Sequence, residues 1–251
     1  MRASAPADGI QTLNVQIDNG DLQVQTHTEN NIQVSVQAEA QGSQELKDKV
    51  TLQTIPAARS LGVRIDKPTL GIGEELKTHL SITLPAHIAL ELTTHNGKIQ
   101  VQKQAASLSL DTQNGDIQLT DIQGDINARS ANGNVLLTNI SGLRHTLFSG
   151  NGTLTLKEVN GAVSAETGNG QIEAELLGVS RPETYAFSSG NGNIRLGLPA
   201  DSSARLSYSK GAGSVKTDFE HLDQQQQILV GQGAARFELK ASNGNIEVYK
   251  R

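Results

Sequence analysis

Residues 96–101 read NGKIQV, residues 114–119 read NGDIQL and residues 132–137 read NGNVLL. The same Asn-Gly pair, followed by alternating apolar residues, recurs along the chain. From Asn96 to Asn191, successive pairs are separated by 18, 18, 19, 18 and 22 residues. A period near 20 is typical of repeat proteins, in which each unit buries its apolar face against its neighbours.

Asparagine marks the same turn in seven repeats, and Ala212-Gly213 occupies this slot once. The seven are Asn96, Asn114, Asn132, Asn151, Asn169, Asn191 and Asn243. Two positions earlier, six repeats carry a hydroxyl: Thr94, Thr112, Ser130, Ser149, Thr167 and Ser189. Stacked amides can hydrogen-bond to one another along an axis. We therefore predict a structural corner ladder, with a ligand-binding line of polar groups as the alternative.

An aliphatic residue stands two positions after every glycine of this column. These residues are Ile99, Ile117, Val135, Leu154, Ile172, Ile194, Val215 and Ile246. Apolar and polar positions alternate around them, which indicates strands. A meander of Asn-Gly hairpins is the alternative, but only stacked coils require the same residue in the same slot every 18 residues. We predict an all-β, single-domain β-solenoid, β-helix-like, with coils of about 18 residues and Asn-Gly corners.

The glycines suggest two corners in each coil. Gly115, Gly124, Gly133 and Gly142 are nine residues apart. Glycine adopts positive φ at little cost, and a corner that turns within two residues uses that region. We therefore predict positive φ at the corner glycines Gly115, Gly133, Gly152 and Gly170.

The regularity of the repeat predicts how the chain is organised. Residues 1–9 are expected to be a disordered tail and residues 10–251 one β-solenoid domain. Its expected parts are irregular capping coils (10–90), regular coils (91–217), an excursion (218–235) and a closing coil (236–251). Within the capping coils we expect strands at 32–36, 50–55, 61–65 and 79–84, and a helical turn at 44–50. A cap is needed because an open stack exposes a strand edge.

Composition excludes several classes of protein. The 251 residues carry a net charge of −5, whereas nucleic-acid binders usually show a basic surplus. Cysteine is absent, which excludes disulfides and thiolate metal sites. The apolar runs fall far short of the roughly 18 residues of a membrane helix. The first residues also lack the apolar run of a signal peptide, so a cytoplasmic chain and a trimmed envelope chain both stay open.

The sequence contains no motif that predicts a catalytic, cofactor-binding or metal-ligating residue. The Gly-Asn-Gly triplets precede strands and not helices, so the dinucleotide mechanism does not apply. Asp116, Asp121 and Asp125 fall on adjacent corners, where solvated carboxylates are expected and a weak calcium site is the alternative. Glu173 and Arg195 are expected to form an ion pair between coils. We predict no cofactor.

His145 occupies a slot that is aliphatic or aromatic in the other repeats. Its coil has 19 residues, one more than its neighbours. We expect the extra residue to tip His145 outward, and a buried neutral ring is the alternative.

Residues 84–101, LPAHIALELTTHNGKIQV, resemble the opening segment of a bacterial putative-adhesin family of unknown function that has a toast-rack β-solenoid (head-GIN-like) domain. Residues 231–248 resemble its closing coil. Family members usually have Ser-Gly at the corner, and here it is Asn-Gly. The resemblance covers roughly residues 10–248 and implies a single-domain β-solenoid, often in the cell envelope, with no assigned catalytic residues.

These observations lead to one main functional hypothesis and two alternatives. The main hypothesis is a non-catalytic, envelope-associated scaffold that presents a flat β face to a protein or glycan partner. It expects no nucleic-acid partner and no membrane span. The alternatives are a glycan-active β-helix enzyme, either a lyase or a hydrolase, and an envelope-stress or signalling module that binds a protein or peptide.

Overall fold

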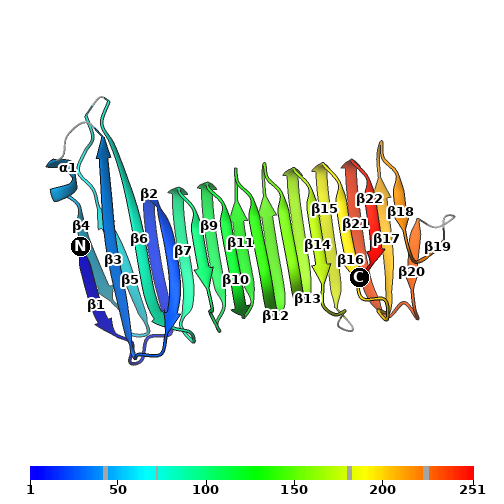
Figure 1. The fold of residues 1–251 in the computed structure, drawn as a ribbon, viewed down its shortest axis with the longest axis horizontal. Helices are drawn as coiled ribbons and strands as arrows, with labels where there is room; N and C mark the ends of the chain where they lie inside the picture. Colours follow the sequence, from blue (N-terminus) through cyan, green and yellow to red (C-terminus); the bar gives the residue numbers. More distant parts are fainter. Residues whose placement is uncertain (42–44, 72, 180–182, 223–225) are drawn as a thin grey trace.

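A computed structural model describes residues 1–41, 45–71, 73–179, 183–222 and 226–251. The strands lie side by side along one long axis (Figure 1), and the chain forms a single all-β domain. The helical turn is short: α1 is Glu45–Asp48. The N-terminal strands are β1 (Arg2–Pro6), β2 (Thr12–His27), β3 (Asn31–Gln41), β4 (Thr51–Pro56), β5 (Ser60–Asp66) and β6 (Glu75–Pro85).

The central coils contain shorter strands and two long ones that bend around a corner. They are β7 (Ala89–Asn96), β8 (Ile99–Gln102), β9 (Leu108–Asn114), β10 (Ile117–Gln123), β11 (Ile126–Ser130), β12 (Val135–Ser149), β13 (Leu154–Asn169) and β14 (Ile172–Leu176). The C-terminal strands are β15 (Thr184–Asn191), β16 (Ile194–Leu198), β17 (Ala204–Lys210), β18 (Val215–Thr217), β19 (Glu220–Leu222), β20 (Gln227–Val230), β21 (Ala235–Asn243) and β22 (Ile246–Lys250).

Parallel pairing between successive coils confirms the solenoid and rules out the hairpin meander. Ile117 pairs with Ile99 of the preceding coil and with Val135 of the following one. Each coil contributes one segment to each of two sheets. The first sheet contains the residues before the Asn-Gly corner, as in β7, β9 and β11, and the second contains those after it, as in β8, β10 and β14.

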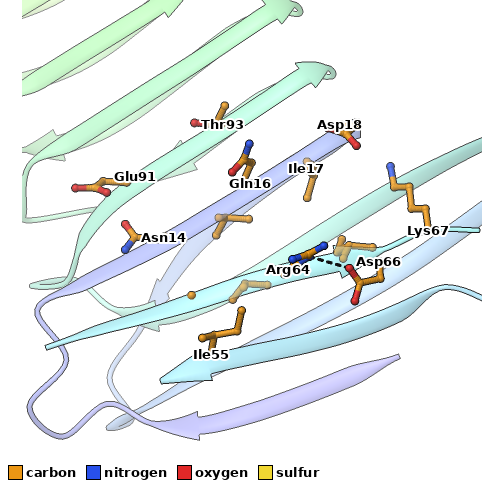
Figure 2. Close-up of a pocket in the computed structure, with 14 residues that line it drawn as sticks. Asn14, Gln16, Ile17, Asp18, Ile55, Arg64, Asp66, Lys67, Glu91 and Thr93 are labelled. Atoms are coloured by element: carbon orange, nitrogen blue, oxygen red, sulfur yellow. Dashed lines mark hydrogen bonds and ion pairs between the residues drawn. The ribbon is translucent and has the colours of Figure 1, made fainter. Parts of the chain in front are cut away.

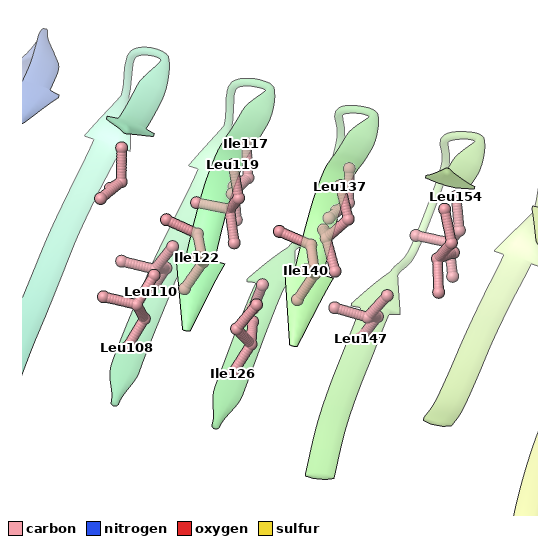
Figure 3. Close-up of a cluster of buried hydrophobic side chains, with 14 of the residues drawn as sticks. Leu108, Leu110, Ile117, Leu119, Ile122, Ile126, Leu137, Ile140, Leu147 and Leu154 are labelled. Atoms are coloured by element: carbon pink, nitrogen blue, oxygen red, sulfur yellow. The ribbon is translucent and has the colours of Figure 1, made fainter. Parts of the chain in front are cut away.

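The core lies between the two sheets. It is built from columns of aliphatic side chains that run along the axis of the stack (Figure 3). Ile117, Val135, Leu154 and Ile172 are fully buried and stack in one such column, as the repeat predicts. Alternation with period two places every second residue inside. The fold therefore follows from repetition of one buried pattern.

The coil formed by β2 and the coil formed by β21 and β22 are not the end coils in space. In the first sheet, β2 lies between β5 and β7, and in the second between β6 and β8. Likewise β21 lies between β15 and β17, and β22 between β16 and β18. The C-terminus therefore lies within the stack (Figure 1), and the predicted closing coil 236–251 is the second coil from its end.

Aromatic packing accompanies the insertion of this C-terminal coil. The ring of Tyr185 in β15 stacks on that of Phe237 in β21, with centroids 4.3 Å apart and planes 3° apart. Phe187 lies parallel to Phe237 at 6.5 Å. Such buried pairs contribute roughly 0.5–1.5 kcal/mol beyond their burial. They stabilise β21 against β15.

The prediction of a disordered tail at residues 1–9 is wrong. Residues 2–6 form β1, which pairs antiparallel with β3, and the N-terminal ammonium donates to Val36 O at 2.8 Å. Ala7 is buried in the core. The tail is ordered because it supplies the edge pairing that β3 would otherwise lack, and β4 covers the edge of β5 in the same antiparallel manner.

The corner glycines are required for a reason other than positive φ. None of Gly115, Gly133, Gly152 and Gly170 lies in the left-handed region, so that prediction is wrong. A Cβ added to Gly115 would instead lie 1.8 Å from Gly97 O, and one added to Gly133 would lie 2.0 Å from Gly115 O. Adjacent coils approach so closely here that the backbone of one coil occupies the space a side chain needs in the next.

Positive φ occurs near the second corner, where Gly161 has a φ of 120° and a column of other residues three positions before the glycine slot also has positive φ. Lys103, Asp121, Asn139 and Glu158 have φ between 55° and 58° and occupy one column. A left-handed conformation costs Lys103 and Glu158 roughly 1–2 kcal/mol each, and costs the short polar Asp121 and Asn139 less. This corner therefore stores strain that the packing of the coils must offset.

His145 points inward, so the expectation that it tips outward is wrong. The extra residue of its coil is absorbed between Ser141 and Arg144, where the register with β13 shifts. As a result Leu143 is 78% exposed, while His145 is 1% exposed and stacks between Ile126 and Val163. Its Nε2 lies 3.0 Å from Asn160 O, and burial lowers the pKa of the imidazole below 6.5.

We predict that Gly133→Ala destabilises the protein by about 1–3 kcal/mol, the usual cost of overpacking, because the new Cβ collides with the neighbouring backbone. Urea unfolding followed by circular dichroism measures the change. Lys103→Gly, at a strained position, should be neutral or slightly stabilising. The opposite ranking of the two variants would show that φ and not close approach selects the corner glycines.

We predict that His145 makes the protein less stable as pH falls. The unfolded imidazole takes up a proton near pH 6.5, whereas the folded one resists it because its pKa is lowered. The free energy of unfolding should therefore decline below about pH 6.5 and level off below the folded pKa. The charge of Asp125 opposes this shift of the pKa, and Arg144 acts on Asp125 in turn.

The measurement is urea unfolding between pH 5 and 8. His145→Leu should flatten the curve in this window, whereas the exposed His87→Gln should not. A wild-type slope in His145→Leu would contradict the prediction.

Candidate functional site

The asparagines of the corner form a continuous column of hydrogen-bonded amides. In seven coils the asparagine Nδ2 donates to Oδ1 of the asparagine in the adjacent coil, at 2.6–2.9 Å. The donors are Asn96, Asn114, Asn132, Asn151, Asn169, Asn191 and Asn243. Asn243 donates to Asn191, in keeping with the inserted C-terminal coil. Asn19, in the N-terminal coil, is the first acceptor.

A buried hydroxyl column runs behind the amides. Each hydroxyl donates to the carbonyl oxygen of the corner glycine in the preceding coil, as Ser130 Oγ does to Gly115 O at 2.8 Å and Thr167 Oγ1 to Gly152 O at 2.9 Å. Gly115 O, which accepts from Ser130, is also the atom that a Cβ on Gly133 of the next coil would collide with. Threonine or serine and glycine thus form one structural unit across adjacent coils.

A third column was missed at the sequence level. The residue after the corner glycine is often Asp or Asn, and its side-chain oxygen accepts the backbone N–H of the next coil. Asp116 Oδ1 accepts from Asn134 N at 2.8 Å, and Asn134 Oδ1 accepts from Thr153 N at 2.9 Å. The recurrence of short polar side chains in this slot was the available signal.

A groove of about 740 Å³ opens where β5 separates from β2 (Figure 2). The two strands pair only as far as Gln16 and Arg64. Beyond this point Lys67 Nζ reaches across and donates to Asn19 O at 2.6 Å. Asn14 Oδ1 is buried there without a hydrogen-bond partner in the described structure.

The charged groups of this groove are of both signs. Arg64 Nε and Asp66 Oδ1 are 2.8 Å apart, and the ion pair is visible in Figure 2. Partial burial lowers the pKa of Lys67, and the charge of Asp18 opposes this shift. The groove can therefore accept small polar molecules, and its lining mixes acidic and basic side chains.

A charged cluster lies on the second sheet near the C-terminal end. Arg195 bridges Glu173 at 3.3 Å and Glu247 at 3.2 Å, which confirms the predicted pairing of Glu173 with Arg195. The guanidinium also lies 4.6 Å from the ring centroid of Tyr249. The Tyr249 hydroxyl donates to Glu175 Oε1 at 3.2 Å, and desolvation followed by this carboxylate raises the tyrosine pKa. The cluster links three coils, through β14, β16 and β22.

The predicted aspartate cluster is divided among separate cross-coil contacts. Asp121 Oδ1 accepts from Asn139 Nδ2, and Asp125 Oδ1 accepts from Leu143 N and Arg144 N. In the described part of the chain, no three His, Asp or Glu side chains converge as metal ligands would. None of the helices in that part has the length and apolarity needed to cross a membrane.

We predict that Asn132→Ala destabilises the protein by about 1–2 kcal/mol, because it removes the hydrogen bonds to Asn114 and from Asn151. Thermal and urea unfolding measure the change. The matched control is Gln113→Ala in the same corner, an exposed residue expected to change stability by less than about 0.5 kcal/mol. Equal effects of the two substitutions would show that the amide column contributes no stability.

Comparison with known proteins identifies relatives of the whole chain. The Toastrack DUF4097 family model matches residues 10–249. A search of curated proteins returns no match to the sequence.

Two solved structures share the fold at low sequence identity. One is described as a putative adhesin from Parabacteroides distasonis: it is 13% identical, with a TM-score of 0.59, covering 98% of this chain and 96% of that one. The other is described as a putative adhesin from Bacteroides fragilis: it is 14% identical, with a TM-score of 0.50, covering 99% and 96%. Together with the stacked coils described above, the family match shows that the chain belongs to the Toastrack DUF4097 family.

Proposed function

We propose that this protein is a non-catalytic, cell-envelope-associated scaffold that presents a flat β face to a binding partner. The proposal rests on one observation: equivalent outward side chains of successive coils lie in register and form straight rows. Gln100 pairs in register with Gln118, which pairs in register with Leu136. Such rows present polar groups at intervals of about 4.8 Å on a rigid support, which suits recognition of an extended partner.

The hydrogen bonding of the corner columns supports an architectural role for them. Within the column each interior asparagine donates one hydrogen bond and accepts one, as Asn132 does between Asn114 and Asn151. These bonds hold the coils in register, so the faces and not the corner are the proposed binding surfaces. If the corner asparagines bound a ligand instead, the ligand would have to compete with these hydrogen bonds between amides.

The state of the carboxylates supports a non-catalytic role. General acid–base catalysis needs a carboxyl or imidazole free to exchange a proton with a substrate atom. Asp116 instead accepts a backbone N–H, and Glu173 is paired with Arg195. The backbone N–H groups of Arg144 and Leu143 lower the pKa of Asp125, which keeps it ionised near neutral pH.

Similarity to the two structures described as adhesins supports the envelope assignment through the fold alone. At 13% and 14% identity it transfers no ligand to this chain. The function therefore has to be tested on the protein itself.

The test measures binding and turnover together. Purified protein is passed over immobilised peptidoglycan, envelope glycans and envelope proteins, and is incubated with a panel of uronate and neutral glycans, with and without Ca²⁺. We expect saturable binding to at least one fraction and no turnover. Binding should weaken when arginines replace outward residues of one sheet, either Ser109 and Ser164 of the first or Gln100 and Thr120 of the second.

Two results would contradict the proposal. One is binding that neither pair of substitutions weakens, because the partner would then not contact a flat face. The other is turnover that Asp116→Asn or Glu173→Gln abolishes, because the protein would then be an enzyme.

A further inference from the structure

One face of the molecule carries a long strip without charged side chains. The strip lies on the second sheet, and its first row crosses seven strands from β3 to β13. In register, Ser35, Ser81, Gln23, Gln100, Gln118 and Thr155 form this row. Leu136 stands between the last two. Six steps between neighbouring strands give the row a length of about 29 Å.

A second row runs beside the first, two residues further along each parallel strand and two residues earlier in the antiparallel β3. It contains Gln33, Thr83, Gln25, Gln102, Thr120 and Thr138. Together the two rows form what we call the neutral strip, in which twelve of thirteen side chains are amides or hydroxyls. Each is exposed or half-buried.

Charges begin where the strip ends. Arg2 pairs opposite Ser35 at the N-terminal end. Lys157 and Glu173 follow Thr138 and Thr155 in the two rows at the other end. Along one long side, Asp21 and His79 lie two residues before Gln23 and Ser81 and are 3.2 Å apart. The strip is therefore an uncharged region with charged borders.

The opposite sheet of the same coils is different. Its outward positions include Glu91, Asp111, Arg129 and Glu166, three acidic residues and one basic residue. Absence of charge is thus a property of the two rows of the strip, because the second sheet also carries charged side chains such as Asp21 and Lys77 beside them. A hollow of about 610 Å³ also opens over one end of the strip, where β1, β3 and β6 meet beside Gln33 and Thr83.

We propose that the neutral strip binds an extended, uncharged glycan that lies along the axis of the stack. This proposal rests on the binding function proposed above and adds its face and the class of its ligand. Glycan hydroxyls both donate and accept hydrogen bonds, as do amide and hydroxyl side chains. Gln100 Nε2 donates to Gln118 Oε1 at 3.1 Å, which leaves the second N–H and the other lone pairs of these amides for a ligand.

An acidic glycan fits the strip poorly. Its carboxylates would lose water without meeting a cation in either row, which is unfavourable. A neutral chain loses only hydroxyl hydration, which the side chains replace. Charge complementarity therefore selects an uncharged ligand.

A protein partner also fits less well. Protein interfaces are enriched in aromatic residues, Met and Arg, and the two rows contain none of these. Leu136 is their one apolar residue. The strip offers many similar hydrogen bonds and no apolar anchor.

The regular spacing predicts that affinity grows with the length of the glycan. Each hydrogen bond to an exposed amide or hydroxyl contributes little net free energy. A chain that meets several coils at once adds these contributions without a new association step. Short oligosaccharides should therefore bind far more weakly than chains that span the strip.

The experiment uses isothermal titration and affinity electrophoresis of the full chain. The probes are cellobiose, cellohexaose, soluble neutral β-glucan, mannan and dextran, with polygalacturonate as the acidic comparison. The test variant is the double substitution Gln23→Glu and Gln118→Glu, which changes charge with almost no change of shape. The matched control carries Gln16→Glu and Gln113→Glu, at exposed positions of the first sheet.

We expect binding of at least one neutral polymer, little binding of polygalacturonate, and tighter binding of longer chains. The test variant should bind at least about tenfold more weakly, and the control should match the wild type. Thermal unfolding of both variants verifies that they fold.

The proposal is overturned if no neutral probe binds, if polygalacturonate binds best, or if both variants lose binding equally. Binding of an envelope protein or glycan that survives in the test variant would also overturn it. In that last case the scaffold function stands, and its site lies on another surface.

Discussion

The structure depends on the close approach of adjacent backbones at the Asn-Gly corner. A Cβ on any of the corner glycines from Gly97 to Gly192 would lie about 2 Å or less from a carbonyl oxygen of the neighbouring coil, as at Gly115 and Gly170. That oxygen also accepts a buried hydroxyl, as Gly115 O does from Ser130. The corner thus sets both the distance between coils and their register. The aliphatic columns, the amide column and the straight surface rows all follow from this register.

Much of the fold could be predicted because the repeat is local and frequent. The slot of Ile117 and Val135 predicts a buried column, and the structure confirms it. Positions that depend on contacts far apart in the sequence could not be predicted. The sequence around Phe237 does not indicate that its coil lies next to Tyr185. The sequence around His145 likewise does not indicate that the extra residue of this coil is accommodated by turning Leu143 outward.

The candidate surface was predictable only in part. Gln100 and Gln118 follow the repeat and can be placed in one row from the sequence. Ser35 and Ser81 come from the irregular N-terminal segment, where β3 runs antiparallel to β6, so their row depends on pairing that the repeat does not encode. The neutral strip therefore becomes visible only when the tertiary register is known. The interleaved N-terminal coil, β2, joins its two parts.

Deletion of one coil tests the central claim that coil register governs the fold. Removing residues 118–135 joins Ile117 to Leu136 and keeps Leu137 in its inward slot, because Leu119 and Leu137 are in register. Removing residues 118–134 shifts the following strand by one residue and turns its core side chains outward. Chemical unfolding followed by circular dichroism compares the two proteins. The account predicts a cooperatively folded protein for the first deletion and loss of structure for the second. Equal stability of the two, or unfolding of the first alone, would contradict it.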